Sequence, residues 1–303
     1  MMKRKDFLLS TALLPTISFR EAVDKKRKSF SIAHITDIHV KPGLVPEKGM
    51  ATVLHAIQTS TTKAAFIINT GDAIMDALVE DKPSVATQWN LFNKILKKEN
   101  ALPIYSCIGN HDIWGWFNKD EQVKQDKVYG KQWAVDELRI PARYYHIQKN
   151  NWAFIFLDST QLNPAGGYIA RLDIAQMEWL AALLPTLGGK HICIFSHIPV
   201  LSICAGLFFN KTQPNGDLVI QRNLMHTDFL QLNTLFSQYK NIRACISGHI
   251  HMQDDITYNG IRYMCNGAVS GNWWQGDFNG FAPAYAMLDF FEDGSIDRKM
   301  LPY

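Results

Sequence analysis

The sequence predicts an α/β protein in which sheets and helices form layers, and two observations carry this prediction. In the first half of the chain, apolar segments of strand length alternate with segments of helical periodicity, as a layered α/β fold requires. The last part of the chain is rich in strands, with an Asn-Gly hairpin turn at Asn259–Gly260 and a second turn at residues 292–295. Hydrophobic residues make up 47% of the 303 residues and aromatic residues 12%, which supplies the core of one large domain.

The apolar periodicity and the turn residues place each element in order. Strands are expected near residues 30–36, 65–70, 103–108, 143–147, 152–158, 191–196, 243–247, 261–266 and 284–290. Helices are expected near residues 50–60, 84–99, 120–137, 173–184 and 226–239. The domain that they form is expected to span residues 29–303.

Residues 1–28 are expected to be an export signal and a linker rather than part of the domain. Lys3, Arg4 and Lys5 precede a short apolar stretch at residues 7–14, which is the layout of a signal peptide and too short to span a bilayer. Residues 4–8 resemble a twin-arginine signal in which Lys5 replaces the second arginine. We therefore expect export to the periplasm and no transmembrane span in the mature protein. A cytoplasmic protein with an amphipathic start is the alternative.

Five of the apolar runs end in residues that bind metal ions. The segments are Asp37-Ile38-His39, Gly71-Asp72, Gly109-Asn110-His111-Asp112, His197, and Gly248-His249-Ile250-His251. Strands that each carry such a residue at the carboxyl end bring these groups to one rim of the fold, where α/β proteins build their sites. Asp and His bind borderline divalent ions, and Asn adds a neutral carbonyl oxygen. No cysteine lies in these segments, which disfavours a thiolate zinc site.

The spacing within the segments suggests how the side chains are presented. Asp37 and His39 alternate along a chain expected to be extended, so both side chains should point to the same side, and His249 and His251 repeat this spacing. The glycines beside the candidate ligands lack a Cβ and allow sharp turns of the backbone; they are Gly71, Gly109 and Gly248. Asp72 is the natural bridge, because one carboxylate can give an oxygen to each of two ions.

These motifs together resemble those of the calcineurin-like metallophosphoesterases, from about residue 32 to residue 266, and most closely the bacterial branch similar to cyclic-nucleotide phosphodiesterases. The resemblance implies a four-layer α/β-β/α sandwich with a dinuclear metal centre. It assigns to one ion Asp37, His39, Asp72 and His251, and to the other ion Asp72, Asn110, His197 and His249. His111 is implied to lie beside the ions as a proton donor or phosphate contact. Asp112 is expected to orient His111 or to cap the following turn.

At two positions the sequence differs from other branches of this family, and one of these differences limits which metal centre is expected. Met75 stands where purple acid phosphatases have the tyrosine that binds iron, and Asp112 stands where protein serine/threonine phosphatases usually have glutamate. An iron–tyrosinate centre is therefore not expected. Two divalent ions are expected, and manganese, iron, zinc and cobalt stay open as their identity.

Substrate contacts are expected from the loops between the motifs. Three tryptophans that follow motif segments are candidates to stack on a substrate or to line an apolar pocket; they are Trp114, Trp273 and Trp274. The alternative is that they pack against a sheet edge. Arg222 lies in a long polar segment of the kind that forms lids, and is a candidate to hold a phosphate oxygen.

The function expected from the motifs is hydrolysis of a small phosphate ester, a diester rather than a monoester. A metal-bound hydroxide is expected to attack phosphorus in line, with His111 protonating the leaving oxygen. The net charge is only +3, and the one dense basic run is at residues 25–28, so a nucleic-acid substrate is disfavoured. A nuclease and a phosphomonoesterase are the alternative enzymes, and a metal-binding scaffold is the alternative that is not an enzyme.

The remaining histidines and the cysteines are expected to be structural. His34 is expected in the core, Asp158 in a turn or supporting role, and His226 on the surface at the start of a helix; His55, His146 and His191 have no motif around them. No disulfide is expected among the five cysteines, which are Cys107, Cys193, Cys204, Cys245 and Cys265.

Overall fold

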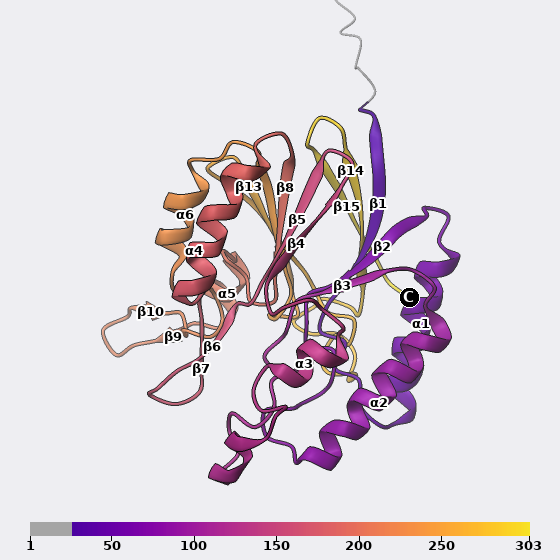
Figure 1. The fold of residues 1–303 in the computed structure, drawn as a ribbon, viewed down its shortest axis with the longest axis vertical. Helices are drawn as coiled ribbons and strands as arrows, with labels where there is room; N and C mark the ends of the chain where they lie inside the picture. Colours follow the sequence, from indigo (N-terminus) through magenta and orange to yellow (C-terminus); the bar gives the residue numbers. More distant parts are fainter. Residues whose placement is uncertain (1–25) are drawn as a thin grey trace, which may run out of the picture.

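The computed structural model describes residues 26–303, which form two central sheets packed face to face, with helices on the outer faces (Figure 1). This is the four-layer α/β-β/α sandwich that the motifs predicted. The strands lie close to their predicted positions, so the alternation of apolar runs with helical segments identified the fold class correctly.

The first sheet contains five strands in the order β15-β14-β1-β2-β3. Their bounds are β1 Lys28–Ile35, β2 Ala64–Asn69, β3 Ile104–Ser106, β14 Tyr285–Phe291 and β15 Ile296–Leu301. β1, β2 and β3 are parallel, and β14 is antiparallel to both of its neighbours. The helices α1 (Leu44–Thr59) and α2 (Lys82–Glu99) connect the parallel strands and cover the outer face.

The second sheet contains six strands in the order β12-β13-β11-β8-β5-β4. Their bounds are β4 Tyr145–Lys149, β5 Trp152–Leu157, β8 His191–Ser196, β11 Ile242–Ser247, β12 Gln253–Tyr258 and β13 Ile261–Asn266. The four inner strands are parallel, and β12 and β4 lie antiparallel at the two edges. Its outer face is covered by α4 (Ile174–Leu183), the short helix η2 (Leu184–Leu187) and α6 (Phe229–Phe236).

The strand β5 shows why its sequence is an unbroken apolar run. Phe154 packs between the two sheets, with its ring centroid 6.0 Å from Phe30 and 5.2 Å from Phe290. Its neighbours Ile155 and Leu157 point the other way, into the core beneath α4 and α6. A strand that is buried on both faces needs apolar residues at successive positions rather than at alternate ones.

Several short elements lie among the loops at the carboxyl ends of the parallel strands. They are η1 (Glu121–Gln125), α3 (Gln132–Glu137), β6 (Thr160–Leu162), β7 (Tyr168–Ala170), α5 (Ile203–Phe208), β9 (Lys211–Thr212) and β10 (Leu218–Val219). The two hairpins β6–β7 and β9–β10, together with α5, were not predicted from the sequence. Figure 1 shows both hairpins projecting from the body of the fold on the side of α4 and α5.

Three predicted helices are wrong in extent. The helix expected at residues 50–60 already begins at Leu44. The helix expected at residues 120–137 is divided into η1 and α3, because Gly130 between them has a φ of 71° and pairs with Trp114 in a short β-bridge. The helix expected at residues 226–239 begins only at Phe229. The backbone N–H of Thr227 donates to Ala170 O, and this bond ties the residues before Phe229 to the β6–β7 hairpin.

The export signal predicted for the amino terminus lies outside the described residues, apart from the end of its linker. The strand β1 already begins at Lys28, so the last residue of the predicted linker belongs to the first sheet. Within residues 26–303, no helix combines the length and the apolar character needed to cross a membrane. All five cysteines lie within the described residues, where each is buried and unpaired.

Candidate metal centre

The loops that follow β1, β2, β3, β8 and β11 bring the seven candidate ligands together at one end of the sandwich. A first group consists of Asp37, His39 and His251. The Nε2 atoms of His39 and His251 lie 3.1 Å apart, and Oδ1 of Asp37 lies 3.4 Å from Nε2 of His251. These three side chains come from both sheets and are almost completely buried.

A second group consists of Asp72, Asn110, His197 and His249. The Nε2 atom of His197 lies 2.9 Å from Oδ1 of Asn110, 3.1 Å from Nδ1 of His249 and 3.2 Å from Oδ2 of Asp72. Oδ2 of Asp72 is also 3.6 Å from Nε2 of His39 in the first group. Asp72 therefore stands between the two groups, where the sequence places the bridging ligand.

The outer nitrogen of each of these four imidazoles faces a backbone carbonyl. His251 Nδ1 lies 2.6 Å from Gly271 O, His249 Nε2 lies 2.8 Å from Asn223 O, and His197 Nδ1 lies 3.0 Å from Thr70 O. His39 Nδ1 lies 3.4 Å from Met75 O. Since a carbonyl only accepts, the outer nitrogens carry protons, and the inner nitrogens are the ones that can present lone pairs to an ion.

The donor set fits a pair of cations. Inner ring nitrogens lie 3.1 Å apart in both groups, and a positive charge has to lie between such a pair. In the ion-free protein the proton of His197 supplies this charge in the second group, and a bound ion can replace it. Oδ1 of Asp37 is buried and has no hydrogen-bond partner among the described residues, which leaves it available as a ligand. The mixture of imidazole, carboxylate and amide oxygen suits borderline divalent ions such as manganese, iron, zinc and cobalt. The structure thus supports the predicted grouping, while the number and identity of the ions stay predictions.

In the ion-free protein, electrostatics keep some donors in their binding forms and place a proton on His197, in the position that an ion would take. Burial lowers the pKa of both His39 and His249 to about 3, so these imidazoles are neutral at physiological pH. Burial also opposes the charged form of Asp72, but the surrounding histidines, His197 first, hold its pKa well below the usual range. The Asp72 carboxylate in turn overcomes the effect of burial on His197 and raises its pKa to about 9.

The backbone at the ligands is not extended, contrary to the prediction for Asp37 and His39. Their φ angles are 52° and 48°, and Asp72, His249 and His251 also have positive φ. The left-handed region is sparsely populated by residues with a side chain, and such residues concentrate at functional sites. Bonds between the loops hold this conformation: the N–H of Asp37 donates to Gly71 O at 3.0 Å, and the N–H of His39 donates to Asp72 O at 2.9 Å.

The glycines beside the ligands are required by close approach as well as by turning. A Cβ on Gly248 would lie 1.9 Å from Oγ1 of Thr36 and 2.3 Å from Oδ2 of Asp37. Gly71 has a φ of 103°, and a Cβ there would lie 2.4 Å from the backbone nitrogen of Gly109. Side chains at these positions would separate the loops that the two groups of ligands share.

Asp112 does not orient His111, contrary to one of its two predicted roles. Its carboxylate accepts from the backbone N–H groups of Asp72 at 3.0 Å, Ala73 at 2.8 Å and Gly109 at 2.8 Å. Burial and the nearby charge of Asp72 raise the pKa of Asp112 to about 6. Asp112 therefore fixes the loop that carries the bridging ligand and is a positioning residue.

The partner of His111 is Asp76, which the sequence analysis missed. Nδ1 of His111 lies 3.6 Å from Oδ1 of Asp76, and the backbone N–H of His111 donates to Oδ1 of Asp72 at 2.8 Å. Although burial opposes it, the carboxylates of Asp72 and Asp76 raise the pKa of His111 to about 9. The signal in the sequence was a second carboxylate four residues after Asp72, in the same loop. The His111 imidazole faces the ligands, with its ring centroid 4.9 Å from that of His39.

The candidate substrate residues separate into different environments. Trp273 lines the metal cavity, with its ring centroid 4.4 Å from that of His251. Trp274 supports the loop instead, since its Nε1 donates to His39 O at 3.0 Å. Trp114 was wrongly proposed: it is buried against Trp133 in the core. Arg222 does not line the metal cavity either, because its guanidinium donates to Gly166 O at 2.6 Å.

The metal cavity has a volume of about 170 Å³. It is lined by His39, Asp72, Asn110, His111, Tyr168, Phe209, Asn223, Leu224, His249, Ile250, His251, Trp273 and Phe278. Tyr168 and Phe278 belong to segments that were not expected at the site, whereas Phe209 and Asn223 lie in the long polar segment that contains Arg222. Burial, followed by the charge of Asp72, raises the pKa of Tyr168, whose hydroxyl therefore stays protonated.

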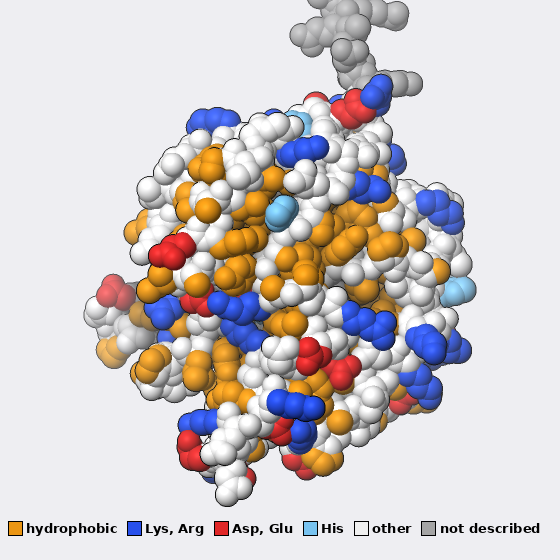
Figure 2. Space-filling model, in the orientation of Figure 1, with side chains coloured by type: hydrophobic (Ala, Val, Ile, Leu, Met, Phe, Trp, Pro, Cys, Tyr) orange, Lys and Arg blue, Asp and Glu red, His pale blue; other side chains and the backbone are white. Residues whose placement is uncertain are grey.

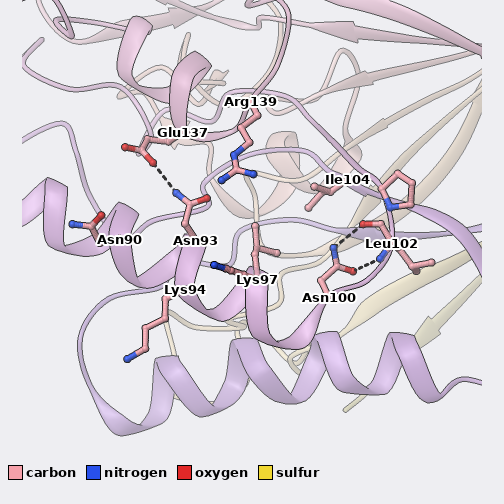
Figure 3. A pocket seen from close by; sticks show the side chains of 11 residues that line it. Asn90, Asn93, Lys94, Lys97, Asn100, Leu102, Ile104, Glu137 and Arg139 are labelled. Carbon is pink, nitrogen blue, oxygen red and sulfur yellow. Dashed lines mark hydrogen bonds between the residues drawn. The ribbon is translucent and has the colours of Figure 1, made fainter.

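A larger cavity, of about 810 Å³, lies along α2 and contains none of the candidate ligands (Figure 3). Its walls include Lys94, Lys97 and Arg139, and the hydrogen bonds there join Asn93 to Glu137 and Asn100 to Leu102. Volume alone would select this cavity. The convergence of ligands and shifted pKa values selects the smaller one.

The other singled-out residues lie away from the ions. His226 is buried rather than on the surface, because its Nδ1 pairs with Oδ1 of Asp228 at 2.8 Å. Asp158 is buried and forms ion pairs with Lys131 at 2.6 Å and Arg143 at 2.8 Å, which is a supporting role. His34 lies in the core as predicted and contacts Oγ1 of Thr70 at 3.0 Å.

A four-layer sandwich with two groups of histidine and carboxylate side chains around a shared aspartate defines a metal-dependent hydrolase. The chain belongs to the calcineurin-like phosphoesterase family, whose model matches residues 30–253. This is the family that the motifs predicted.

Relatives and solved structures agree with this assignment. The chain is 22% identical over 289 residues to the 3′,5′-cyclic-nucleotide phosphodiesterase of Nostoc sp., covering 90% of this chain and 93% of that protein. It is 23% identical over 282 residues to the 3′,5′-cyclic adenosine monophosphate phosphodiesterase CpdA of Escherichia coli, covering 89% and 88%. The fold is similar to a dimetal phosphatase from Danio rerio, with a TM-score of 0.61 and 14% identity over 90% of this chain and 96% of that chain. It is also similar to a purple acid phosphatase from yellow lupin, with a TM-score of 0.55 and 13% identity over 89% and 51%.

Proposed function

We propose that this protein is a phosphodiesterase that hydrolyses 3′,5′-cyclic nucleotides at a centre of two divalent metal ions. The arrangement around Asp72 carries the proposal: inner imidazole nitrogens face one another on both sides of this carboxylate, and backbone carbonyls hold the outer nitrogens. The substrate class is drawn from the names of the relatives in Nostoc and Escherichia coli, which match this chain over most of both lengths.

Each ion would be held by its own group of ligands. Asp37, His39 and His251 would hold one ion, and Asn110, His197 and His249 the other, with Asp72 shared. Bound ions supply the Lewis acidity that neutralises charge on the phosphoryl oxygens as the ester bond breaks. The loops that carry these ligands are fixed by Asp112 and by the close approach at Gly248, so the ligands are positioned before the substrate arrives.

His111 would give the proton to the leaving oxygen. Water adds to phosphorus and gives up one proton, the bond from phosphorus to the leaving oxygen breaks, and that oxygen takes the proton from the imidazolium. The proton released by the water balances the one that His111 donates, so the imidazolium is restored through solvent. The charges of Asp72 and Asp76 favour the protonated form of His111, which an acid needs before it reacts. Asp76 would act through His111 by orienting its ring.

The alternative of a nuclease finds little support on the visible surface. On the face shown in Figure 2, lysines and arginines lie scattered among acidic and apolar side chains rather than in one continuous strip. A protein that tracks a nucleic-acid backbone needs clustered positive charge.

The direct test is a panel of esters assayed with manganese, iron, zinc, cobalt and magnesium. The panel would contain 3′,5′-cyclic AMP, 3′,5′-cyclic GMP, bis(p-nitrophenyl) phosphate and nucleoside 5′-monophosphates. We expect metal-dependent hydrolysis of the cyclic nucleotides to nucleoside monophosphates that are not hydrolysed further. Activity confined to monoesters would contradict the proposal.

We also propose, from residues 1–28 alone, that the protein is exported through a twin-arginine-like signal. This segment should carry a fused reporter, one that is active only after export, out of the cytoplasm. Replacing both Arg4 and Lys5 by glutamine should abolish that export. A reporter that stays in the cytoplasm with the unchanged segment would favour the cytoplasmic alternative.

A further inference from the structure

A second cavity adjoins the metal cavity and shares two of its walls. It has a volume of about 550 Å³, and it is lined by Phe117, Gly167, Tyr168, Val219, Ile220, Gln221, Arg222 and Asn223. Tyr168 and Asn223 also line the metal cavity. We call this second space the outer cavity. Tyr168 and Asn223 thus lie between the two cavities, and a ligand that occupies both would have to pass these residues.

The wall of the outer cavity is fixed relative to the metal ligands. The backbone carbonyl of Asn223 accepts from Nε2 of His249 at 2.8 Å, so the segment that lines the outer cavity also orients a metal ligand. The carbonyl of Arg222 accepts from the N–H of Ala170 at 2.8 Å, which joins the same segment to β7. The guanidinium of Arg222 is held by Gly166 O in the β6–β7 hairpin.

The volumes of the two cavities suit different parts of a nucleotide. Small-molecule sites in proteins occupy about 300–1,000 Å³. The metal cavity, at about 170 Å³, is below that range and has room for the phosphate and its immediate neighbours. The outer cavity, at about 550 Å³, has room for a further group of the size of a nucleobase.

The lining of the outer cavity suits a planar heterocycle. Phe117, Val219 and Ile220 keep 36%, 44% and 38% of their surface exposed, although they are large apolar side chains that could be covered by a ligand. Polar groups that can reach the edge of a ring come from Tyr168, Gln221 and Asn223. Apolar faces with a few placed polar groups are typical of sites that hold an aromatic ligand in one orientation.

The aromatic residues inside the metal cavity are less suited to this role. Trp273 lies against His251, with ring centroids 4.4 Å apart, and meets Phe278 edge to face at 5.5 Å. Phe278 in turn stacks with Phe209 at 6.1 Å. These rings are engaged with one another and with a candidate metal ligand, so they form a packed wall.

We propose that the outer cavity binds the base of the nucleotide, with Phe117 and Ile220 against its faces and with Tyr168 and Asn223 at the junction, where they determine specificity. This inference rests on the proposed function, since it assigns the position of the base in the cyclic nucleotide that the metal centre would hydrolyse.

The first experiment locates the base by photolabelling. The metal-loaded full chain would be irradiated with 8-azidoadenosine 3′,5′-cyclic monophosphate, and the adducts would be mapped by mass spectrometry. We expect adducts at Phe117 or within residues 219–223, suppressed by excess cyclic AMP. Suppressible adducts confined to residues 273–278 would overturn the assignment.

The second experiment measures specificity and does not depend on labelling. Phe117→Ala and Ile220→Ala should lower the ratio of kcat/KM for cyclic AMP to kcat/KM for methyl p-nitrophenyl phosphate by about tenfold, mainly through KM for cyclic AMP. Leu207→Ala removes an exposed apolar side chain that lines neither cavity, and it should leave this ratio unchanged.

The outcomes separate the two proposals. If the unchanged enzyme hydrolyses no cyclic nucleotide, the proposed function itself fails. If it hydrolyses cyclic nucleotides and both variants keep the unchanged ratio, only the assignment of the outer cavity fails.

Discussion

Nδ1 of His111 lies 3.6 Å from Oδ1 of Asp76, whereas Asp112, the next residue in the sequence, binds backbone N–H groups with its carboxylate. The two carboxylates near His111 therefore have separate tasks. Asp76 acts on the imidazole, and Asp112 acts on the loop that carries Asp72. This division leads to distinguishable effects of mutation.

His111→Ala should slow the reaction according to the leaving group. If His111 donates the proton, its loss should cost about 10²–10⁴-fold in kcat for cyclic nucleotides, whose sugar alkoxide is a poor leaving group. Nitrophenyl diesters, whose leaving group needs little protonation, should lose much less. The measurement is kcat on both substrate types, together with metal content. Equal losses would indicate electrostatic phosphate binding instead, and loss of an ion would make His111 a ligand.

Asp76→Asn should move the alkaline limb of the pH profile to lower pH. An acid works below its pKa, and the charges of Asp72 and Asp76 help to raise the pKa of His111 to about 9. Removing one of these charges lowers that pKa, so activity on poor leaving groups should begin to decline at lower pH than in the unchanged enzyme. The check is kcat/KM for cyclic AMP against pH, with Asp217→Asn on the exposed hairpin as the matched control. An alkaline limb that stays in place would show that Asp76 does not tune His111.

Asp112→Asn should instead weaken the fold around the ligands. The amide nitrogen of the new side chain would face backbone N–H donors, and a lost hydrogen bond to a charged group costs about 1.5–3 kcal/mol. We expect lower thermal stability and weaker metal binding, with no preference between leaving groups. Calorimetry and metal titration measure both effects. A variant that is as stable as the unchanged protein, but slow only on substrates with poor leaving groups, would show that Asp112 orients His111 after all.

His34 should make the ion-free protein less stable as the pH falls. Burial lowers its pKa to about 3, against about 6.5 in the unfolded chain, so the unfolded state takes up a proton first. The contribution of His34 is therefore complete above pH 6.5 and is lost between about pH 6.5 and 3, at up to about 1.4 kcal/mol per pH unit. Urea unfolding in a chelator, compared with His34→Gln, checks this. The variant should show a shallower dependence between pH 4 and 6.5, and identical slopes would contradict the account.

The sequence predicted which residues meet at the site better than it predicted their surroundings. Asp37, Asp72 and His197 follow apolar strands, and parallel strands bring their carboxyl ends to one rim whatever the loops do. The left-handed backbone at Asp37 could not be predicted, because bonds between loops from different strands impose it. Asp76 was missed because only the path of the loop shows that it turns back to His111.

The errors have a common physical cause. Trp114 follows the motif of His111, but the turn at Gly115 and the bridge to Gly130 place its ring in the core. Tyr168 and Asn223 lie in short hairpins and loops without hydrophobic periodicity, so only the tertiary structure brings them to the metal cavity. The local sequence pattern thus identified the strands and the residues that gather at their ends. It could not identify contacts that depend on how the loops fold back onto the site.

The central claim is that Asp72 joins two groups of ligands into one dinuclear centre. Elemental analysis of carefully loaded protein measures this most directly, with Asp72→Ala beside it and Asp217→Ala as an exposed carboxylate control. We expect about two ions per chain in the unchanged protein and the control, as in two-metal phosphoesterase sites, and the loss of both ions in Asp72→Ala. A single tightly held ion that Asp72→Ala leaves in place would contradict the account.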